Sequence, residues 1–579
     1  MLMGLGIAAT FVLLRVMNEA SPKWWNRYLA VFASTWFCIH TANTETVNYL
    51  SARSDLLSTL AVVLAFCVYF LPAPARRRYW CVLPMAIGAL VKTPAVVFAP
   101  LLLVYALLFE ERLSGPDLFR RTAWPHLRST VSRCVPVLAA GVVLFLLVEG
   151  MNPDTVVSSQ HSRVGYLITQ PFVWLDYLRL FFVPIGLTAD AEWELLRYWY
   201  DTRLFAGLLG LGLLSWLAWR ASTSHVTRPV AFGLIWFAVA LAPTSSLFPL
   251  SEVSSEHPIF FPYLGLTLAV VWGVRIVIER WAAAAPRLVA VAVGLVVFTI
   301  LTGNAYATHV RNRVWLSDES LWSDVVEKSP NNGRAWMNYG LTQMAQGRYA
   351  RTKELFDRAA VLTPNYSTLE INLGIVTDQL GDQVAAERHF RRALELSADR
   401  SSYFYLARWF AQRARAPEAI PLLEQSLQLS PGFTLPRDLL TNLHYAMGDR
   451  SGVQALIDDT VVVSPADPVA GAYARGATPF TSAVVDAASA FSQGVELTGQ
   501  SRHLEAAVTY RHALELSGEP AGQGWETAAD AWNNLGWELA QLGVFEEAIG
   551  ALERAVALRP DYELAANNLV WAREELATR

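Results

Sequence analysis

Long apolar stretches, separated by short polar segments, recur along roughly the first half of the chain. A helix needs about 20 predominantly apolar residues to cross the hydrocarbon core of a bilayer. About ten stretches approach this requirement, at residues 2–17, 28–43, 56–71, 79–91, 94–109, 135–149, 203–219, 229–246, 259–279 and 286–303. The pattern therefore predicts a polytopic helical membrane domain over residues 1–303.

Two of these stretches lie close together and are each short, at residues 79–91 and 94–109. A single helix through both would place Lys92 in the middle of the bilayer, where an isolated charge is costly. Two helices that turn between Val91 and Pro94 avoid this cost, because the turn brings the ammonium group to the membrane surface. We therefore expect two helices here.

The loops between the apolar stretches form two sets that differ in positive charge. Cytoplasmic loops of membrane proteins are enriched in Lys and Arg. The richer set holds Lys23, Arg27, Arg76, Arg77, Arg78, Arg112, Arg120, Arg121, Arg128, Arg133, Arg220, Arg228, Arg275, Arg280 and Arg287, and the poorer set holds Arg53, Lys92, Arg163, Arg197 and Arg203. The richer set is therefore predicted to be cytoplasmic, which places Met1 and all residues after 304 on the extracytoplasmic side.

This sidedness requires that residues 166–188 do not cross the membrane. The stretch is apolar but contains Asp176, Arg179 and two prolines, so we expect an interfacial or re-entrant segment. The chain opens almost directly in an apolar helix, without the charged region or cleavage site of a signal peptide. Since an outside N-terminus with no preceding span is uncommon, we expect a further helix upstream of Met1.

Charge divides the chain at the same place as hydrophobicity. Residues up to 303 contain 22 Lys and Arg against 16 Asp and Glu, whereas the remainder contains 24 against 34. A mildly basic apolar half followed by an acidic half is typical of a bilayer domain joined to a soluble one. Neither half has the basic excess of a nucleic-acid-binding protein.

Metal and nucleotide motifs are absent from the sequence. No His/Cys cluster has zinc spacing, and no Walker or dinucleotide-binding glycine motif occurs, so no metal site and no such cofactor is predicted. The four cysteines lie in or beside apolar segments and are interpreted as small buried hydrophobes. They are Cys38, Cys67, Cys81 and Cys134.

The second half repeats itself with a period of 34 residues, which is the period of tetratricopeptide (TPR) repeats. The first repeat, 333–366, has Trp336, Gly340 and Phe356 at positions where TPRs place large, small and large residues. Small residues at such positions let paired helices approach closely, and large ones fill the gaps between them. The predicted organisation is a junction at 304–332, repeats 1–4 at 333–467, a linker at 468–485, repeats 5–6 at 486–562 and a capping helix at 563–579.

The predicted fold class is therefore all-α, with a polytopic membrane domain followed by an α-solenoid of TPRs. A TPR array provides a concave binding surface and carries no information about catalysis. Polypeptide binding is the default function of such an array, and a spacer or dimerisation arm is the alternative.

Three clusters of ionisable residues fall on the predicted extracytoplasmic side, where such residues near a membrane often mark function. Because all three lie on one side, we expect them to line one cavity. The clusters are His40, Glu45, Arg53 and Asp55; Lys92; and Glu252, Glu256 and His257.

Each cluster also has a structural interpretation. Arg53 and Asp55 would form a surface ion pair at the start of a helix, Lys92 would snorkel to the interface, and Glu252 and Glu256 would lie in a solvated loop. A further acidic group is interpreted as part of a wet, amphipathic loop: Asp190, Glu192 and Glu194.

The three clusters together resemble one known family. The segment HTANTETVNYLSARSDLLSTL, the turn at Lys92, and APTSSLFPLSEVSSEHPIFFPYLGL are similar to conserved segments of the transmembrane and TPR-containing O-mannosyltransferases and their bacterial relatives. The segment RNRVWLSDESLWSDVVEKSPNNGRAWMNYG is similar to the junction through which that family enters its first TPR. The resemblance covers essentially the whole chain.

This resemblance implies a membrane fold of the glycosyltransferase-C type. Such proteins transfer a sugar, mannose-like here, from a polyprenyl-phosphate carrier to an acceptor such as a Ser or Thr hydroxyl outside the cytoplasm. Apart from this donor no cofactor is assigned, and the need for a divalent metal stays open. A cation must stabilise the leaving phosphate and a carboxylate must take the acceptor proton. The donor phosphate would meet residues around Lys92, Glu252, Glu256 and His257, with Arg53 as a further candidate cation.

The sequence departs from the family pattern at several positions. The resemblance implies an acidic pair, containing the general base, between the first two helices, but residues 2–17 match the second helix, so that loop would precede Met1. Thr41, Thr93 and His257 replace a proline, an acid and an arginine of the pattern. Glu45 is the nearest acid that we nominate as a site residue, without assigning it as the base.

Two functions therefore stay open at the level of sequence. One is a transferase of the lipid-linked-sugar kind, complete or lacking its first helix and acidic loop. The other is a non-catalytic, membrane-anchored TPR scaffold. Transport is a weaker alternative, because no inverted repeat or pair of broken helices is evident.

Overall fold

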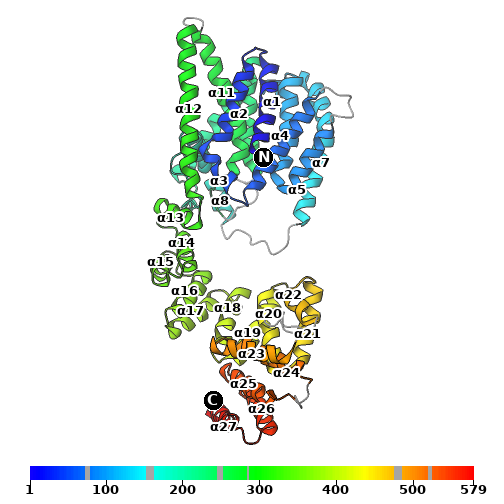
Figure 1. The fold of residues 1–579 in the computed structure, drawn as a ribbon. Helices are drawn as coiled ribbons and strands as arrows, with labels where there is room; N and C mark the ends of the chain where they lie inside the picture. Colours follow the sequence, from blue (N-terminus) through cyan, green and yellow to red (C-terminus); the bar gives the residue numbers. More distant parts are fainter. Residues whose placement is uncertain are drawn as a thin grey trace. The chain divides into compact units, whose positions relative to one another are not determined.

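The computed structural model describes residues 1–71, 79–151, 162–243, 252–282, 286–474, 486–518 and 525–578. Within these ranges the chain forms helices and contains no β-strand, which confirms the all-α prediction (Figure 1). The helices divide into two compact units, Met1–Tyr339 and Gly340–Arg579. We call them the membrane unit and the solenoid unit and describe each by itself.

The membrane unit contains helices of very different lengths. They are α1 (Leu2–Ala20), α2 (Asn26–Ile39), α3 (Thr44–Asn48), α4 (Arg53–Phe70), α5 (Val82–Val91), α6 (Phe98–Tyr105), α7 (Trp124–Met151), α8 (Arg163–Phe182), α9 (Thr202–Ser222), α10 (Arg228–Ala242), α11 (Phe260–Ala282), α12 (Pro286–Val314) and α13 (Asp318–Lys328). Eight helical segments of the described residues are long and apolar enough to cross a membrane. They correspond to eight of the predicted stretches, whereas the helices at 28–43 and 79–91 are shorter.

The core of the membrane unit combines aromatic side chains with small residues. Phe66 of α4 stacks on Trp236 of α10 with ring centroids 5.4 Å apart, and both rings are fully buried. Helices α10 and α11 approach closely at Gly233. An added Cβ at this position would meet the backbone of Gly265, so no larger residue fits between the two helices. Small residues at helix contacts are the usual means of tight packing between membrane helices.

The chain turns at Lys92 as the sequence predicts. Helix α5 ends at Val91, Lys92 is extended with φ −158°, and a 3₁₀ turn over Thr93–Val97 leads into α6. The two apolar stretches are therefore separate helices, which confirms that part of the prediction.

Helix α8 covers most of the stretch for which we expected an interfacial or re-entrant segment. It is one continuous helix of 20 residues, although it contains Pro171. It packs on α9, where the added Cβ of any larger residue at Gly207 would meet the backbone of Pro171. The helix is not among the eight segments that are apolar enough to cross a membrane.

The solenoid unit consists of antiparallel helix pairs. The pairs are α14 (Gly333–Ala345), whose first part belongs to the membrane unit, with α15 (Tyr349–Leu362); α16 (Ser367–Gln379) with α17 (Gln383–Leu396); α18 (Arg400–Ala411) with α19 (Ala416–Leu429); α20 (Thr434–Met447) with α21 (Arg450–Val463); α23 (Ala487–Gly499) with α24 (His503–Leu516); and α25 (Ala528–Gln541) with α26 (Phe545–Leu558). Helix α27 (Glu563–Thr578) follows the last pair. Residues Pro468–Ala474 of the expected linker form α22, and residues 475–485 lie outside the described residues.

One contact recurs inside four of these pairs. A glycine in the first helix faces a large side chain in the second, so closely that an added Cβ would lie 2.5 to 2.8 Å from it. These distances are shorter than real carbon contacts, so the helices can approach this far only because the residue is glycine. The pairs are Gly340 with Phe356, Gly374 with Phe390, Gly494 with Tyr510, and Gly536 with Leu552.

Candidate functional site

Glu45 joins two of the predicted clusters. Helix α2 ends at Ile39, and a 3₁₀ turn leads into the short α3, which holds Glu45 almost fully buried. His257 donates through Nδ1 to Oε1 of Glu45 at 3.0 Å, and the backbone N–H of Glu256 donates to Oε2 at 3.2 Å. His257 lies in the 3₁₀ turn that precedes α11. Residues 212 positions apart in the sequence are therefore in direct contact.

Lys92 brings in the third cluster. Its Nζ donates to Oδ2 of Asp55, in the first turn of α4, at 2.6 Å. Asp55 lies close enough to His257 and Glu45 for their charges to interact with it. The structure thus brings members of all three clusters close together, and of these residues Glu256 lines the polar cavity described below.

Arg53 and His40 have other roles. Arg53 is exposed, and its Nε donates to the carbonyl oxygen of Val47 at 3.2 Å. His40 is buried and uses both ring nitrogens: Nε2 donates to the carbonyl oxygen of Phe181 at 2.9 Å, and Nδ1 accepts from the N–H of Ala42 at 3.3 Å. His40 therefore fastens the end of α2 to α8 rather than facing a cavity.

Glu256 and Arg311 form a buried pair with unsatisfied polar atoms. Their side chains are 6% and 5% exposed, and Nη2 of Arg311 lies 3.6 Å from Oε1 of Glu256, which is too far for a good hydrogen bond. Both carboxylate oxygens of Glu256, and Nε and Nη2 of Arg311, lack a hydrogen bond of good geometry among the described residues, although the backbone of Thr188 approaches the Glu256 carboxylate and favours its charged form. Burial raises the pKa of Glu256 to about 8, although the charge of Arg311 opposes this shift.

The other side of Arg311 is fully engaged. Its Nη1 donates to Asp324 of α13 at 2.8 Å, and Asp324 also pairs with Lys328 at 2.7 Å. Lys328 in turn donates to the carbonyl oxygen of Leu187 at 2.8 Å. The junction helix α13 is therefore tied to the site through one chain of charged contacts.

Arg334, at the start of α14, holds two further acids. Its Nη2 donates to Glu252 at 3.0 Å and its Nε donates to Asp190 at 2.9 Å. Burial raises the pKa of Glu252, while the positive charge of Arg334 acts in the opposite direction. Asp190 is only 6% exposed. The interpretation of this acidic stretch as a wet loop is therefore wrong for Asp190, because an arginine that is distant in sequence covers it.

A polar cavity of about 360 Å³ lies beside Glu256. It is bounded by the end of α8, by the loop that follows α8, and by the end of α13. Arg179 on its wall is paired with Asp176 at 2.6 Å. The charged groups that line it are Asp176, Arg179, Glu192, Glu256 and Lys328, and the hydroxyl groups are those of Tyr177, Thr188, Ser254, Ser255 and Ser329.

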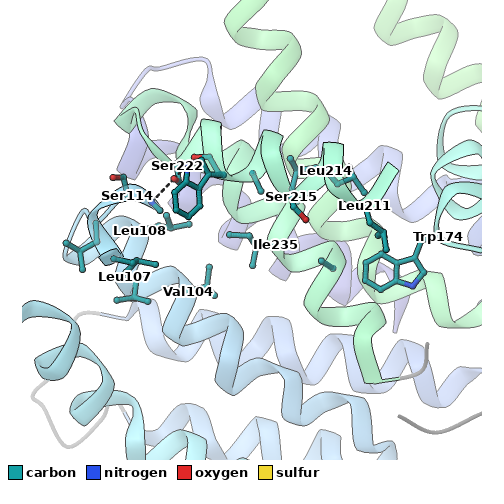
Figure 2. Close-up of a pocket in the computed structure, with 17 residues that line it drawn as sticks. Val104, Leu107, Leu108, Ser114, Trp174, Leu211, Leu214, Ser215, Ser222 and Ile235 are labelled. Carbon is teal, nitrogen blue, oxygen red and sulfur yellow. Dashed lines mark hydrogen bonds between the residues drawn. The ribbon is translucent and has the colours of Figure 1, made fainter. Parts of the chain in front are cut away.

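A second cavity of about 360 Å³ is almost entirely apolar. Helices α6, α9 and α10 form its walls, and Figure 2 shows Trp174 at one end with Ser114 and Ser222 at the other. At that end the N–H of Gly115 donates to Oγ of Ser222 at 2.8 Å. Trp174 belongs to α8 and precedes Tyr177, which lines the polar cavity, by one helical turn. The two cavities therefore approach each other along α8.

In the part of the chain that the structure describes, no group of three or more His, Cys, Asp or Glu side chains is placed to hold a metal ion. No charge cluster predicted from the sequence contains Arg311, Asp324, Lys328 or Arg334. All four lie in the junction segment, which resembles the family pattern. The family resemblance therefore marked this segment, but hydrophobic periodicity does not show which of its charged side chains form ion pairs, or with which partners.

Comparison with known proteins adds two findings. Tetratricopeptide-repeat family models match residues 319–367 and 529–562. The protein O-mannosyl-transferase Tmtc3 of Drosophila melanogaster is 24% identical over 63% of this chain and 44% of that protein. The protein O-mannosyl-transferase TMTC3 of Homo sapiens is 22% identical over 94% of this chain and 57% of that protein. The resemblance inferred from the motifs is thus confirmed, and this chain spans about half the length of the curated relatives it matches.

Among solved structures, the TPR protein YrrB matches 42% of this chain and 96% of its own chain, at 15% identity and a TM-score of 0.22.

Proposed function

We propose, from the premise that this chain is a homologue of the protein O-mannosyl-transferases, that it transfers a sugar from a polyprenyl-phosphate donor to a polypeptide hydroxyl. The transfer takes place on the extracytoplasmic side of the membrane. The sugar is mannose-like, and the solenoid unit binds the acceptor or a partner polypeptide.

The observation that carries this proposal is the polar cavity next to an unsatisfied acid and arginine. Glu256 lines the cavity, and neither of its carboxylate oxygens has a hydrogen bond of good geometry among the described residues. Buried polar atoms without partners are rare in proteins and call for a ligand, a water molecule or a catalytic role. A substrate hydroxyl that enters the cavity would supply the missing partner.

The paired cavities fit the two parts of a lipid-linked donor. The apolar groove beside Trp174 offers a surface for an isoprenoid chain, and the polar cavity accommodates its sugar-phosphate head. Lys92 and His257 are more exposed than the acids that hold them, with side chains 30% and 25% exposed against 12% for Asp55 and 5% for Glu45. Neither Lys92 nor His257 lines the polar cavity, whose own cationic side chains are Arg179 and Lys328, but their network adjoins the cavity at Glu256. Lys92 and His257 would therefore meet a phosphate at the edge of the cavity, while the buried acids orient them.

In the proposed reaction the acceptor hydroxyl oxygen attacks the anomeric carbon of the sugar. The bond between that carbon and the phosphate oxygen breaks, and polyprenyl phosphate leaves with the electron pair. Glu256 takes the hydroxyl proton. A carboxyl group with a pKa near the working pH suits this role, and the pKa of Glu256 is raised to about 8 by burial.

A non-catalytic scaffold is the second candidate function. It is favoured by the pairing of the other site acids, since Glu45 contacts His257, Asp55 contacts Lys92 and Glu252 contacts Arg334. A buried charge network that only fixes one arrangement of the helices would have the same pairs.

The test is sugar transfer from a radiolabelled polyprenyl-phosphate mannose donor to extracytoplasmic polypeptides, in membranes that contain this chain. We expect Glu256→Gln to lower the transfer rate at least about a hundredfold while donor binding is retained. Lys92→Gln should weaken donor binding, and Arg392→Gln, an exposed residue of the solenoid unit, serves as the control. If the chain neither binds the donor nor transfers sugar, but the solenoid unit still captures a polypeptide, the scaffold function is correct.

A further inference from the structure

The solenoid unit contains a polar cavity of about 440 Å³ between the end of α20 and the helices α24, α25 and α26. Most of its lining is polar, which is unusual in an array whose helices pack through apolar side chains. Three arginines, two glutamates and one tryptophan supply the functional groups, and we call the cavity the arginine pocket. These residues are Arg450, Arg511, Glu515, Trp532, Glu547 and Arg554.

Trp532 is the deepest of these groups. It is 2% exposed, and its indole Nε1 has no hydrogen-bond partner among the described residues. The guanidinium carbons of Arg554 and Arg511 lie 4.6 Å and 5.5 Å from the indole ring. A buried N–H donor without an acceptor costs free energy, so its presence beside two cations indicates that a negatively charged oxygen belongs there.

The surrounding contacts fix the shape of the pocket. Gly448 has φ +83°, and an added Cβ there would lie 3.0 Å from the guanidinium carbon of Arg511. This space lets Arg511 donate to the carbonyl oxygen of Ala446 at 3.0 Å and 3.3 Å. The carboxylate of Glu515 accepts hydrogen bonds from the hydroxyl of Tyr445 at 2.7 Å and from Arg450 at 3.2 Å. The pocket is therefore built before any ligand enters.

Arg554 differs from the other two arginines. Within the described residues it has no ion-pair partner, although Glu547 lines the same pocket. An arginine stacked on a buried indole keeps its outer N–H groups directed to a ligand, because stacking occupies the face of the guanidinium and leaves its edge available. Arg554 is thus the arginine of the pocket that is left to bind a ligand, with the indole ring of Trp532 beneath it.

We propose that the arginine pocket binds a carboxylate side chain of an acidic polypeptide segment. The lining carries three positive and two negative groups, so its net charge of one matches a carboxylate better than a doubly charged phosphate. The indole and the side chains of Met447 and Leu514 offer apolar surface to the methylene groups of Asp or Glu. This inference concerns the solenoid unit alone and does not depend on the proposed sugar transfer.

The experiment measures fluorescence anisotropy of a labelled peptide with the full chain in nanodiscs at low salt. The probe peptide alternates glutamate with glycine and serine, and its counterpart has glutamine in place of glutamate. We expect the glutamate peptide to bind at least about tenfold more tightly, because hydrogen bonds between charged groups are the strong ones. Arg554→Gln should weaken binding about three- to tenfold, and Glu547→Gln should strengthen it by removing a like charge.

Arg392→Gln removes the same charge elsewhere in the solenoid unit and should leave binding unchanged. Arg392 and Arg554 are both exposed, so neither substitution threatens the fold. Equal binding of the two peptides would overturn the proposal. An equal loss in Arg392→Gln and Arg554→Gln would do the same, because it would indicate attraction by overall charge. Saturable binding of inorganic phosphate that depends on Arg554, without binding of the glutamate peptide, would assign the pocket to phosphate instead.

Discussion

The solenoid unit and the charged site of the membrane unit achieve specificity in opposite ways. In the solenoid one contact, a glycine against a large side chain, occurs in four helix pairs at equivalent positions. In the membrane unit each contact occurs once and joins segments far apart in the sequence, as with Glu45 and His257. A repeated contact leaves a period in the sequence, whereas a unique contact leaves none. The two regions also differ in how a substitution changes stability. A substitution at one glycine contact disturbs one helix pair, whereas a buried charge that loses its partner affects the whole charged site.

Removal of Arg311 should produce the largest effect. Arg311→Ala would leave the buried carboxyl group of Glu256 without its cation and Asp324 with Lys328 alone, and loss of one member of a buried pair costs about 3–5 kcal/mol. The measurement is thermal and chemical unfolding of the full chain in detergent. Arg392→Gln breaks an exposed pair with Glu395 and should cost less than about 0.5 kcal/mol. Similar losses of stability in the two variants would show that the charged site is no more sensitive to the loss of an ion pair than the solenoid surface is.

The pH dependence of the membrane unit should give the next largest effect. Burial raises the pKa of Glu256 from an ordinary 4.5 to about 8, so between these values the folded chain holds a proton that the unfolded chain releases. Stability contributed by this group is therefore present at low pH and decreases as the pH rises from about 4.5 to about 8, by on the order of a few kcal/mol.

Glu256→Gln should flatten that part of the pH profile, because glutamine keeps the shape of the protonated acid and does not ionise. The profile is obtained from unfolding midpoints of both proteins across this pH range. A variant whose profile is as steep as that of the parent would place the titrating group elsewhere. The contacts of Gly340 with Phe356 and of Gly374 with Phe390 contain no ionisable group and should be insensitive to the same change.

A change within one repeat should have the smallest effect. Gly374→Val would bring its Cβ to 2.8 Å from the ring of Phe390, and overpacking of this kind costs about 1–3 kcal/mol. The measurement is hydrogen–deuterium exchange in α16 and α17 of the full chain. Gly550→Ala, in a helix with nothing within 4 Å of the added Cβ, should be neutral or slightly stabilising.

Combining Gly374→Val with Phe390→Leu sharpens this test. Leucine already occupies the equivalent position opposite Gly536, so the smaller side chain should recover part of the loss. If the double variant is as unstable as the sum of the two single variants, Gly374 and Phe390 do not interact as the structure indicates.

These differences explain how far the sequence could predict the structure. The helix pairs of the solenoid, the turn at Lys92 and eight of the apolar helices follow from local composition and periodicity. The convergence of Glu45, Lys92 and His257 was expected from their common side of the membrane. The partners Arg311 and Arg334 were not, because an ion pair between distant segments depends on helix packing, which no local pattern contains.

The sequence also misled at particular places. His40 belongs to a segment that resembles the family pattern, yet both of its ring nitrogens bond to backbone groups. Asp190 lies in a polar stretch that is typical of a solvated loop, yet Arg334 covers it. In both cases the residue type predicted an ionisable group near the site, and only the surrounding helices determine whether that group is free to react.

The spacing of the glycine contacts has an evolutionary consequence. Gly340 and Gly374 are separated by one full repeat, and each faces its large partner sixteen positions further on. An in-frame deletion or duplication of one such unit would leave every remaining helix with a complementary neighbour, so the length of the array can change by single genetic events. The charged site has no comparable freedom, because insertion of a few residues between α12 and α13 would separate Arg311 from Asp324. Lineages of this protein should therefore differ in repeat number while the junction keeps a constant length.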